Sequence, residues 1–239
     1  MTRSFGISHV GRVRKNNEDR YLAVSQLGLY VVADGMGGAQ AGERASQLTI
    51  DTLGDEISKK GSSVTLTDLS KAVEEANRRV RADARAHPQY SGMGTTVVAV
   101  LVRPAKAYVV NVGDSRLYKK SADSFECITS DHSWINEVGR SIDLSDDELK
   151  THAYRNMLTR AIGADDKAEP QKLEINFTAG EILLLSSDGL HGVIDDAQMS
   201  AVLGQPASLQ ERGEALVESV LDQGAPDNVT AVLIANYDD

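Results

Sequence analysis

Cysteine is almost missing from this sequence, because Cys127 is the only one among 239 residues. A single cysteine excludes an intrachain disulfide and is consistent with a reducing compartment. A cysteine-dependent phosphatase is also excluded, since that mechanism needs an arginine six positions further on and the chain has Ser133 there. We therefore interpret Cys127 as an ordinary, buried small hydrophobic residue.

Positive charge is scarce as well: 25 Lys and Arg stand against 35 Asp and Glu, a formal net charge of −10. Binding to nucleic acid or to anionic lipid needs clustered Lys and Arg, so the composition argues against both. No apolar run approaches the length of a membrane span, and residues 1–11 hold no apolar signal core. We predict a soluble, cytoplasmic protein with one domain over residues 1–239.

Nucleotide-binding fingerprints and internal repeats are absent too. The glycine-rich turn with Gly35 and Gly37 has Gln40 where a dinucleotide fingerprint needs its third glycine. No Walker A sequence occurs, which excludes a P-loop kinase. The chain therefore contains neither of the common phosphate-cradling loops.

What is present is a series of short apolar runs separated by turns. They predict strands over residues 21–24, 29–33, 95–102, 107–112, 116–119, 125–129, 182–186 and 229–235. Helical spacing predicts helices over about 40–60, 195–203 and 209–221. Another predicted helix begins at a cap formed by Thr67 or Asp68 and ends at about Ala86. Residues 1–19 and 130–170 show no strong strand signal, although Ser145 to Glu148 has the pattern of a helix start. Helices grouped in pairs favour an α+β fold, with two antiparallel sheets packed face to face and helices outside.

Acidic residues stand where several of these runs end. Asp34-Gly35 and Asp188-Gly189 follow apolar strands, whereas Asp114 and Asp227 lie in tight turns and Glu18-Asp19 precedes the first hairpin. Each acid alone is most simply a turn residue. Gathered at one edge of a sandwich, however, they would repel each other unless a cation neutralised them. Oxygen ligands without His or Cys favour Mg²⁺ or Mn²⁺ over Zn²⁺.

Seven motifs, taken in order, show a resemblance to a known family. They are Arg14 with Asn17-Glu18-Asp19-Arg20, Val32 to Gly38, Gly94-Thr95-Thr96, Asn111 to Arg116, Leu158 to Gly163, Ser187 to Leu190, and Asp227 to Thr230. In these motifs the chain resembles the bacterial metal-dependent protein serine/threonine phosphatases of the PPM, or PP2C-like, type. The resemblance covers nearly the whole chain and implies an αββα sandwich, in which helix pairs flank two antiparallel sheets.

The resemblance also implies a centre of two Mn²⁺ or Mg²⁺ ions at one end of the sandwich. In that family pattern Asp34 bridges both ions, and the Gly35 carbonyl binds one of them. Glu18 or Asp19 contributes to the same ion, directly or through water.

The remaining family positions complete the implied site. Asp188 and Asp227 match the ligands of the second ion, and Asp114 matches the position that holds, with Asp188, a third and weaker ion. Arg14 matches the position that binds the substrate phosphate, where a guanidinium grips two oxygens at once. Water activated by the cations would attack phosphorus in line, so no covalent intermediate is needed.

One position departs from the eukaryotic pattern, which has a histidine after the Asp-Gly pair where this chain has Met36. The proton donor to the leaving alkoxide is therefore unassigned; a metal-bound water is favoured, with His132 and His152 as alternatives. The insert over about 131–158 matches the family's flap beside the active site. Trp134 and Ile135 either pack this flap onto the body or serve an ordinary core role.

The expected function is hydrolysis of phosphoserine and phosphothreonine on proteins, opposing a cognate Ser/Thr kinase. Expected partners are phosphorylated proteins and that kinase, without nucleic acid or membrane, and the expected state is a monomer. Two alternatives stay open: a catalytically silent regulatory module on the same fold, and a phosphatase for small phosphomonoesters. Retention of Asp34, Asp114, Asp188 and Asp227 argues against the silent module, because an acid cluster without metal is costly.

Overall fold

Two five-stranded antiparallel sheets face each other in the computed structural model, which describes all residues except 1, 39, 138–151, 153, 155–156 and 238–239. The first sheet, in spatial order, contains β1 (Thr2–His9), β12 (Val229–Asn236), β11 (Ile182–Ser186), β8 (Arg116–Lys120) and β9 (Phe125–Cys127). The second contains β10 (Gln171–Asn176), β7 (Lys106–Val112), β6 (Val97–Arg103), β3 (Leu29–Ala33) and β2 (Arg20–Val24). A short pair, β4 (Gly35–Met36) with β5 (Gly94–Thr95), extends from the second sheet.

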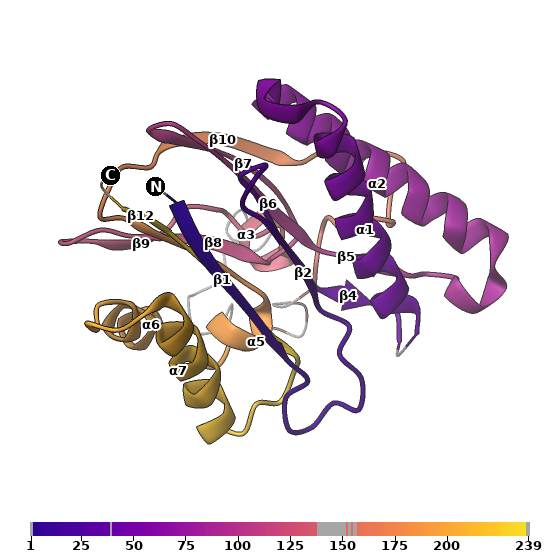
Figure 1. Cartoon of the computed structure of the whole chain (residues 1–239). Helices are drawn as coiled ribbons and strands as arrows, with labels where there is room; N and C mark the ends of the chain where they lie inside the picture. The colour runs from indigo at the N-terminus through magenta and orange to yellow at the C-terminus, as the bar shows by residue number, and fades with distance from the viewer. Residues whose placement is uncertain (1, 39, 138–151, 153, 155–156, 238–239) are drawn as a thin grey trace.

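Helix pairs cover the two outer faces (Figure 1). On the second sheet lie α1 (Ala41–Ser58) and α2 (Leu66–Ala86), and on the first lie α6 (Asp196–Leu203) and α7 (Leu209–Asp222). Short helical turns occupy Gly61–Ser63 (η1), Pro88–Tyr90 (η2), Trp134–Glu137 (α3) and Asp188–His191 (α5). The predicted α+β sandwich with flanking helix pairs is therefore confirmed.

Alternation along the central strands produces three apolar layers. In β3, Leu29 and Val31 pack toward α1 and α2, whereas Tyr30 and Val32 point into the space between the sheets. Because both faces of such a strand are buried, its sequence is apolar throughout rather than alternating. Rigid strands of this kind fix the positions of whatever residues follow them.

The predicted hairpin is confirmed, because β2 pairs with β3 and Tyr21 lies opposite Val32. The predicted cap of α2, Thr67 or Asp68, is wrong by two or three residues: Thr65 is the N-cap, and its side chain accepts a hydrogen bond from the Asp68 N–H. The Asp68 carboxylate in turn accepts from the Thr65 N–H, which makes a capping box.

Two strands of the five-stranded sheets escaped prediction, β1 and β10, and the short strand β4 was not predicted either. Both β1 and β10 mix polar and apolar residues because they are edge strands with partly exposed faces. The single strand predicted over 95–102 is divided at Thr96, whose N–H bonds to Asp34. The helix start predicted at Ser145 to Glu148, with most of the predicted flap, lies outside the described residues.

Cys127 is exposed rather than buried, because it lies on the edge strand β9. Its Sγ hydrogen-bonds the Thr129 carbonyl oxygen at 3.3 Å. Within the part of the chain that the structure describes, no helix has the length and apolar character needed to cross a membrane.

Candidate active site

Asp34 follows β3 directly, and two threonines hold its backbone. The Asp34 N–H donates to Thr96 Oγ1 at 3.0 Å, and the Thr96 N–H donates to the Asp34 carbonyl oxygen at 2.8 Å. Thr95 Oγ1 donates to the same carbonyl oxygen, also at 2.8 Å. Because these bonds satisfy the main chain, the position of Asp34 is fixed without any use of its carboxylate oxygens.

Gly35 lies at a point where three segments meet. A Cβ atom at this position would stand 2.2 Å from the Gly42 carbonyl oxygen and 2.7 Å from the Glu18 carbonyl oxygen. Any larger residue would push α1 and the segment before β2 away from the Asp34 turn. The Asp-Gly pair is therefore a packing requirement of the site as well as a turn.

Asp188 stands at the first position of α5, and only Ser187 separates it from the end of β11. The next residue, Gly189, also has no space for a side chain, since a Cβ atom would lie 1.9 Å from the Asn228 carbonyl oxygen. This contact brings the start of α5 against the turn that carries Asp227. The two acids, 39 positions apart in sequence, consequently line one cavity.

Ser187 and Asn228 hold the N-terminal segment against these strand ends. Ser187 Oγ donates to Asp19 Oδ2 at 2.7 Å and accepts from the Thr230 N–H at 3.0 Å. Asn228 Oδ1 accepts from the Glu18 N–H at 2.8 Å, and its Nδ2 donates to the Val10 carbonyl oxygen at 2.9 Å. Sequence reasoning quoted both residues as motif members but missed these roles, because their partners are remote in the chain.

Asp114 lies in the turn between β7 and β8, after Gly113 with a φ of 99°. His132 holds this turn: its backbone N–H donates to the Gly113 carbonyl oxygen at 3.0 Å, and its Nδ1 accepts from the Gly113 N–H at 3.1 Å. Burial lowers the pKa of His132. His191 supports the same region, because Nδ1 lies 2.9 Å from Ser186 Oγ and the ring hydrogen-bonds the Asp114 backbone.

The strand ends enclose a cavity of about 520 Å³ at one end of the sandwich. Its walls include every predicted site residue except Asp19: Arg14, Glu18, Asp34, Gly35, Asp114, Asp188 and Asp227. Asp19 is only 1% exposed and reaches the site through Ser187. Met36, Met157 and Leu158 add apolar wall.

Neither histidine considered as a proton donor belongs to the described lining of this cavity. His132 is occupied by the Gly113 turn. His152 stacks on Trp134, with ring centroids 4.3 Å apart, and Tyr154 meets the same indole edge-on at 6.2 Å. Trp134 thus packs against residues of the predicted flap, whereas Ile135 is partly buried.

Crowding of the carboxyl groups is visible in their pKa values. Burial, then the charges of Asp19 and Asp188, raises the pKa of Asp34 well above its usual value, and the Asp34 and Asp188 carboxyl groups hydrogen-bond each other. Burial raises the pKa of Asp19 to about 6, and burial with Asp188 raises that of Asp114 to about 7. A proton shared between two acids neutralises part of the negative charge of the cluster, and a bound cation would neutralise more of it.

The donor set fits hard divalent cations. Five residues with carboxylate side chains line the cavity together with Gly35, and the buried Asp19 Oδ1 has no hydrogen-bond partner. Among the described residues, no three His, Cys, Asp or Glu side chains already stand in the geometry of a metal site. Arg14 instead pairs with Asp227, with Nη2 and Oδ2 2.7 Å apart.

A helix-flanked pair of antiparallel sheets with an oxygen-lined acidic cavity at one end defines a class of metal-dependent hydrolase. Comparison with known proteins gives the family. The model of the family described as protein phosphatase 2C matches residues 6–233. The chain belongs to this family and is a metal-dependent protein serine/threonine phosphatase.

Individual relatives agree with this assignment. The chain is 32% identical to the serine/threonine phosphatase Stp of Listeria innocua, over 94% of this chain and 92% of that protein. It is 33% identical to the solved serine/threonine phosphatase PstP/Ppp of Mycobacterium tuberculosis, with a TM-score of 0.90 and 99% of both chains covered. A structure of the PstP catalytic domain in complex with two manganese ions is 32% identical, with a TM-score of 0.88 and 99% of both chains covered.

Proposed function

We propose that the acidic cavity is the catalytic centre and that its oxygens hold two divalent cations, Mn²⁺ or Mg²⁺. The proposed ligands are Asp34 as the bridge, the Gly35 carbonyl, Glu18 or Asp19, and then Asp188 and Asp227, with Asp114 and Asp188 for a third, weaker ion. The observation that carries this proposal is the convergence of five carboxylates and Arg14 on one cavity. Their mutual repulsion is relieved by bound positive charge.

When bound, the cations supply a water of lowered pKa as nucleophile and positive charge beside the phosphoryl oxygens. Arg14 binds the substrate phosphate in this proposal. Its side chain lines the cavity and is 57% exposed, and its guanidinium is held only by Asp227 in the described contacts. A phosphate offers two oxygens to the guanidinium fork and so replaces Asp227, which frees that acid for a cation.

Water in the cavity is the proposed proton donor to the leaving alkoxide. Met36 lines the cavity, but a thioether has no proton to give. His132 and His152 are engaged elsewhere, with Gly113 and Trp134 respectively. A serine or threonine alkoxide is basic enough to take a proton from water as it leaves.

Phosphorylated proteins are the proposed substrates, and a cognate Ser/Thr kinase is the proposed opposing enzyme. The phosphatase identity of the family supports the first statement. The single cysteine and the acidic composition support a monomer that works in the cytoplasm, as one domain over residues 1–239.

Turnover of a phosphothreonine peptide and of p-nitrophenyl phosphate, measured with Mn²⁺ and with excess EDTA, tests the proposal. Asp188→Ala and Asp227→Ala should each lower kcat/KM by at least about a hundredfold, since even indirect metal contacts cost 10–100-fold. Asp123→Ala, an exposed turn acid, is the matched control and should leave the rate unchanged. Full activity in EDTA, or an unaffected Asp188→Ala variant, contradicts the metal site.

The same measurements separate the alternatives. A much higher kcat/KM for small phosphomonoesters than for the phosphopeptide would identify a small-molecule phosphatase. Binding of the phosphopeptide without turnover of either substrate in Mn²⁺ would identify a catalytically silent module.

A further inference from the structure

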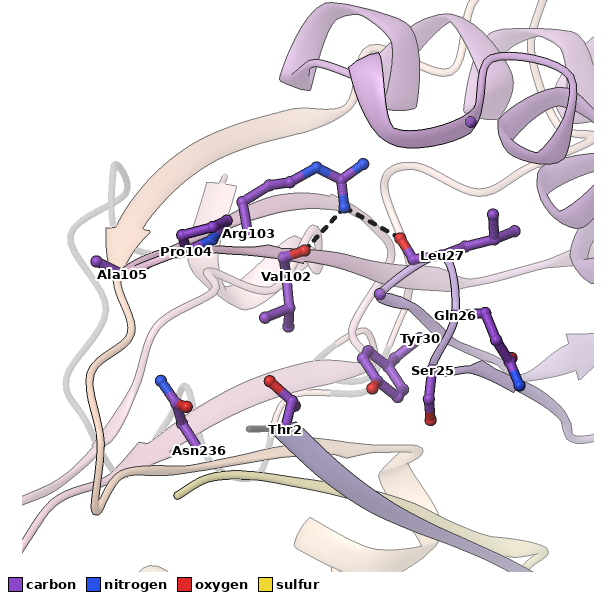
Figure 2. A pocket seen from close by; sticks show the side chains of 12 residues that line it. Thr2, Ser25, Gln26, Leu27, Tyr30, Val102, Arg103, Pro104, Ala105 and Asn236 are labelled. Atoms are coloured by element: carbon purple, nitrogen blue, oxygen red, sulfur yellow. Dashed lines mark hydrogen bonds between the residues drawn. The ribbon is translucent and has the colours of Figure 1, made fainter. Parts of the chain in front are cut away.

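A second cavity, of about 690 Å³, lies where the loops at the other end of the strands meet. Figure 2 shows Thr2 and Asn236 on one side of it and Val102 and Arg103 on the other. The walls come from both sheets, and none of the described lining residues is acidic. The chain has a net charge of −10, yet the only charged residue in the described lining of this cavity is an arginine.

This cavity is distant from the catalytic one along the strands. β3 begins directly after Gly28 of the second cavity and ends directly before Asp34 of the first. β12 begins directly after Asn228 of the catalytic cavity and ends at Asn236 of the second, so that these two residues are separated by eight positions or roughly 26 Å of extended chain. A ligand in the second cavity therefore has no contact with the catalytic acids.

Arg103 is the charged group of this cavity, and its guanidinium is only partly satisfied. Nη1 donates to the Leu27 carbonyl oxygen at 3.0 Å and to the Val102 carbonyl oxygen at 2.8 Å (Figure 2). Nε and Nη2 are buried, yet no hydrogen-bond acceptor reaches either of them. No carboxylate in the described part of the chain forms an ion pair with Arg103, whereas Arg20, Arg44 and Arg116 each have one.

An unpaired cation in this position is costly. Burial lowers the pKa of Arg103, which records the free energy lost when a guanidinium leaves water without a counter-charge. The hydrogen bonds to the Leu27 and Val102 carbonyl oxygens use Nη1 alone. Two donors of the guanidinium fork remain for an acceptor, and a carboxylate or phosphate is the group that matches such a fork.

We propose that this cavity binds a small molecule that carries a carboxylate or phosphate group, with the oxyanion on Arg103. Leu27, Val102 and Pro104 offer apolar contact to the body of the ligand, and Ser25, Thr2 and the Tyr30 hydroxyl offer hydrogen bonds. Because Nε and Nη2 are covered, the oxyanion reaches them only when neighbouring lining residues shift. Binding should consequently perturb the backbone at Gly28, where a Cβ atom would lie 3.3 Å from Arg103 Nη1, and at Gly61, which lines the same cavity.

The test is a titration of the ¹⁵N-labelled full chain with benzoate and, separately, with inorganic phosphate, followed by amide chemical shifts. Saturable shifts at Gly28, Gly61 and Ala105 are expected with at least one probe. A response to benzoate alone indicates a carboxylate ligand with an apolar body, and a response to phosphate alone indicates a phosphorylated one. Phosphate bound at the catalytic site shifts residues near Asp34 instead, so the two sites are distinguished.

Three variants complete the experiment. Arg103→Met keeps the apolar stem and should weaken binding by about tenfold or more, the loss expected for a charge-assisted contact. Arg78→Met removes an exposed arginine on α2 and should leave binding unchanged. Gln26→Trp places bulk at the exposed Gln26 position with Arg103 intact and should also weaken binding, which keeps the test valid if Arg103→Met unfolds.

Absence of saturable shifts at tens of millimolar of either probe overturns the proposal, because affinity weaker than that is not specific. Equal binding by wild type and by Arg103→Met overturns it too. In either event the role of Arg103 is limited to holding the Leu27 loop through its hydrogen bond to the Leu27 carbonyl oxygen.

Discussion

Individual acids of the site are anchored through groups other than the oxygens that face the cavity. Asp34 is held by its backbone N–H and carbonyl, through Thr95 and Thr96. Asp19 is held by one oxygen on Ser187, and its other oxygen has no partner. The fold therefore fixes where negative charge is concentrated before any cation is bound, which is the preorganisation that a metal site requires.

Arg14 is the residue whose loss should separate phosphate binding from metal binding. Arg14→Ala should lower kcat/KM by an amount equivalent to roughly 1–3 kcal/mol, mainly through a higher KM, because one charge-assisted contact to phosphate is lost. Steady-state kinetics with p-nitrophenyl phosphate measure the effect. The Mn²⁺ concentration for half-maximal rate should not rise, because loss of Arg14 removes the partner that competes with a cation for Asp227.

Arg12→Ala is the matched control for that variant, because Arg12 is an exposed arginine two positions away. Its rate should equal that of wild type. If Arg14→Ala keeps the wild-type KM and kcat/KM, Arg14 has no role in binding the substrate phosphate.

Among the elements, those with a strong local signal were the ones that sequence could predict. β3 and β11 are almost entirely apolar because both faces are buried, so both strands could be predicted. Asp34 and Asp188 could then be recognised as acids that follow the ends of buried strands. β1 and β10 were missed because an edge strand needs no continuous apolar pattern. Tertiary partners were beyond sequence reasoning: nothing local indicates that Ser187 bonds Asp19 across 168 positions.

The short helix α5 links two of the predicted metal-binding elements through His191. The imidazole hydrogen-bonds Ser186 on β11 and the Asp114 backbone in the β7–β8 turn. His191→Leu removes both bonds and leaves two polar groups unsatisfied, so it should lower the free energy of unfolding by about 2–4 kcal/mol. Looser coupling of Asp114 to Asp188 should also raise the Mn²⁺ concentration needed for half-maximal activity.

Urea unfolding and a Mn²⁺ titration of activity measure these two effects. A double-mutant cycle with Ser186→Ala supplies the control, because residues that act through one bond have non-additive effects. Additive losses, or an unchanged Mn²⁺ requirement in a folded His191→Leu variant, would show that His191 only fills space.

For the whole molecule, the contribution of the acid cluster to metal-free stability and its capacity to bind metal depend on pH in opposite senses. Asp19 and Asp114 have pKa values raised to about 6 and about 7, above the ordinary value near 3.8. Their contribution to stability is fully present below about pH 4 and is lost as pH rises through 6 to 7. His132 and His191, whose pKa values are lowered, contribute in the opposite direction as pH falls below about 6.5.

Comparing Tm with and without Mn²⁺ at each pH removes the histidine contributions, which both samples share. Protons compete with cations for the carboxylates at low pH, so the gain in Tm caused by Mn²⁺ should grow from about pH 5.5 to about pH 8. At about pH 8, with Mn²⁺ near a hundred times its dissociation constant, the gain should be roughly 5–10 °C, and less than half of that at about pH 5.5.

Asp114→Asn, which has no proton to lose at this position, should flatten the pH dependence while the protein stays folded. A Tm gain that is constant or falls with pH would mean that these carboxyl groups do not bind the cation, whatever the activity of the enzyme.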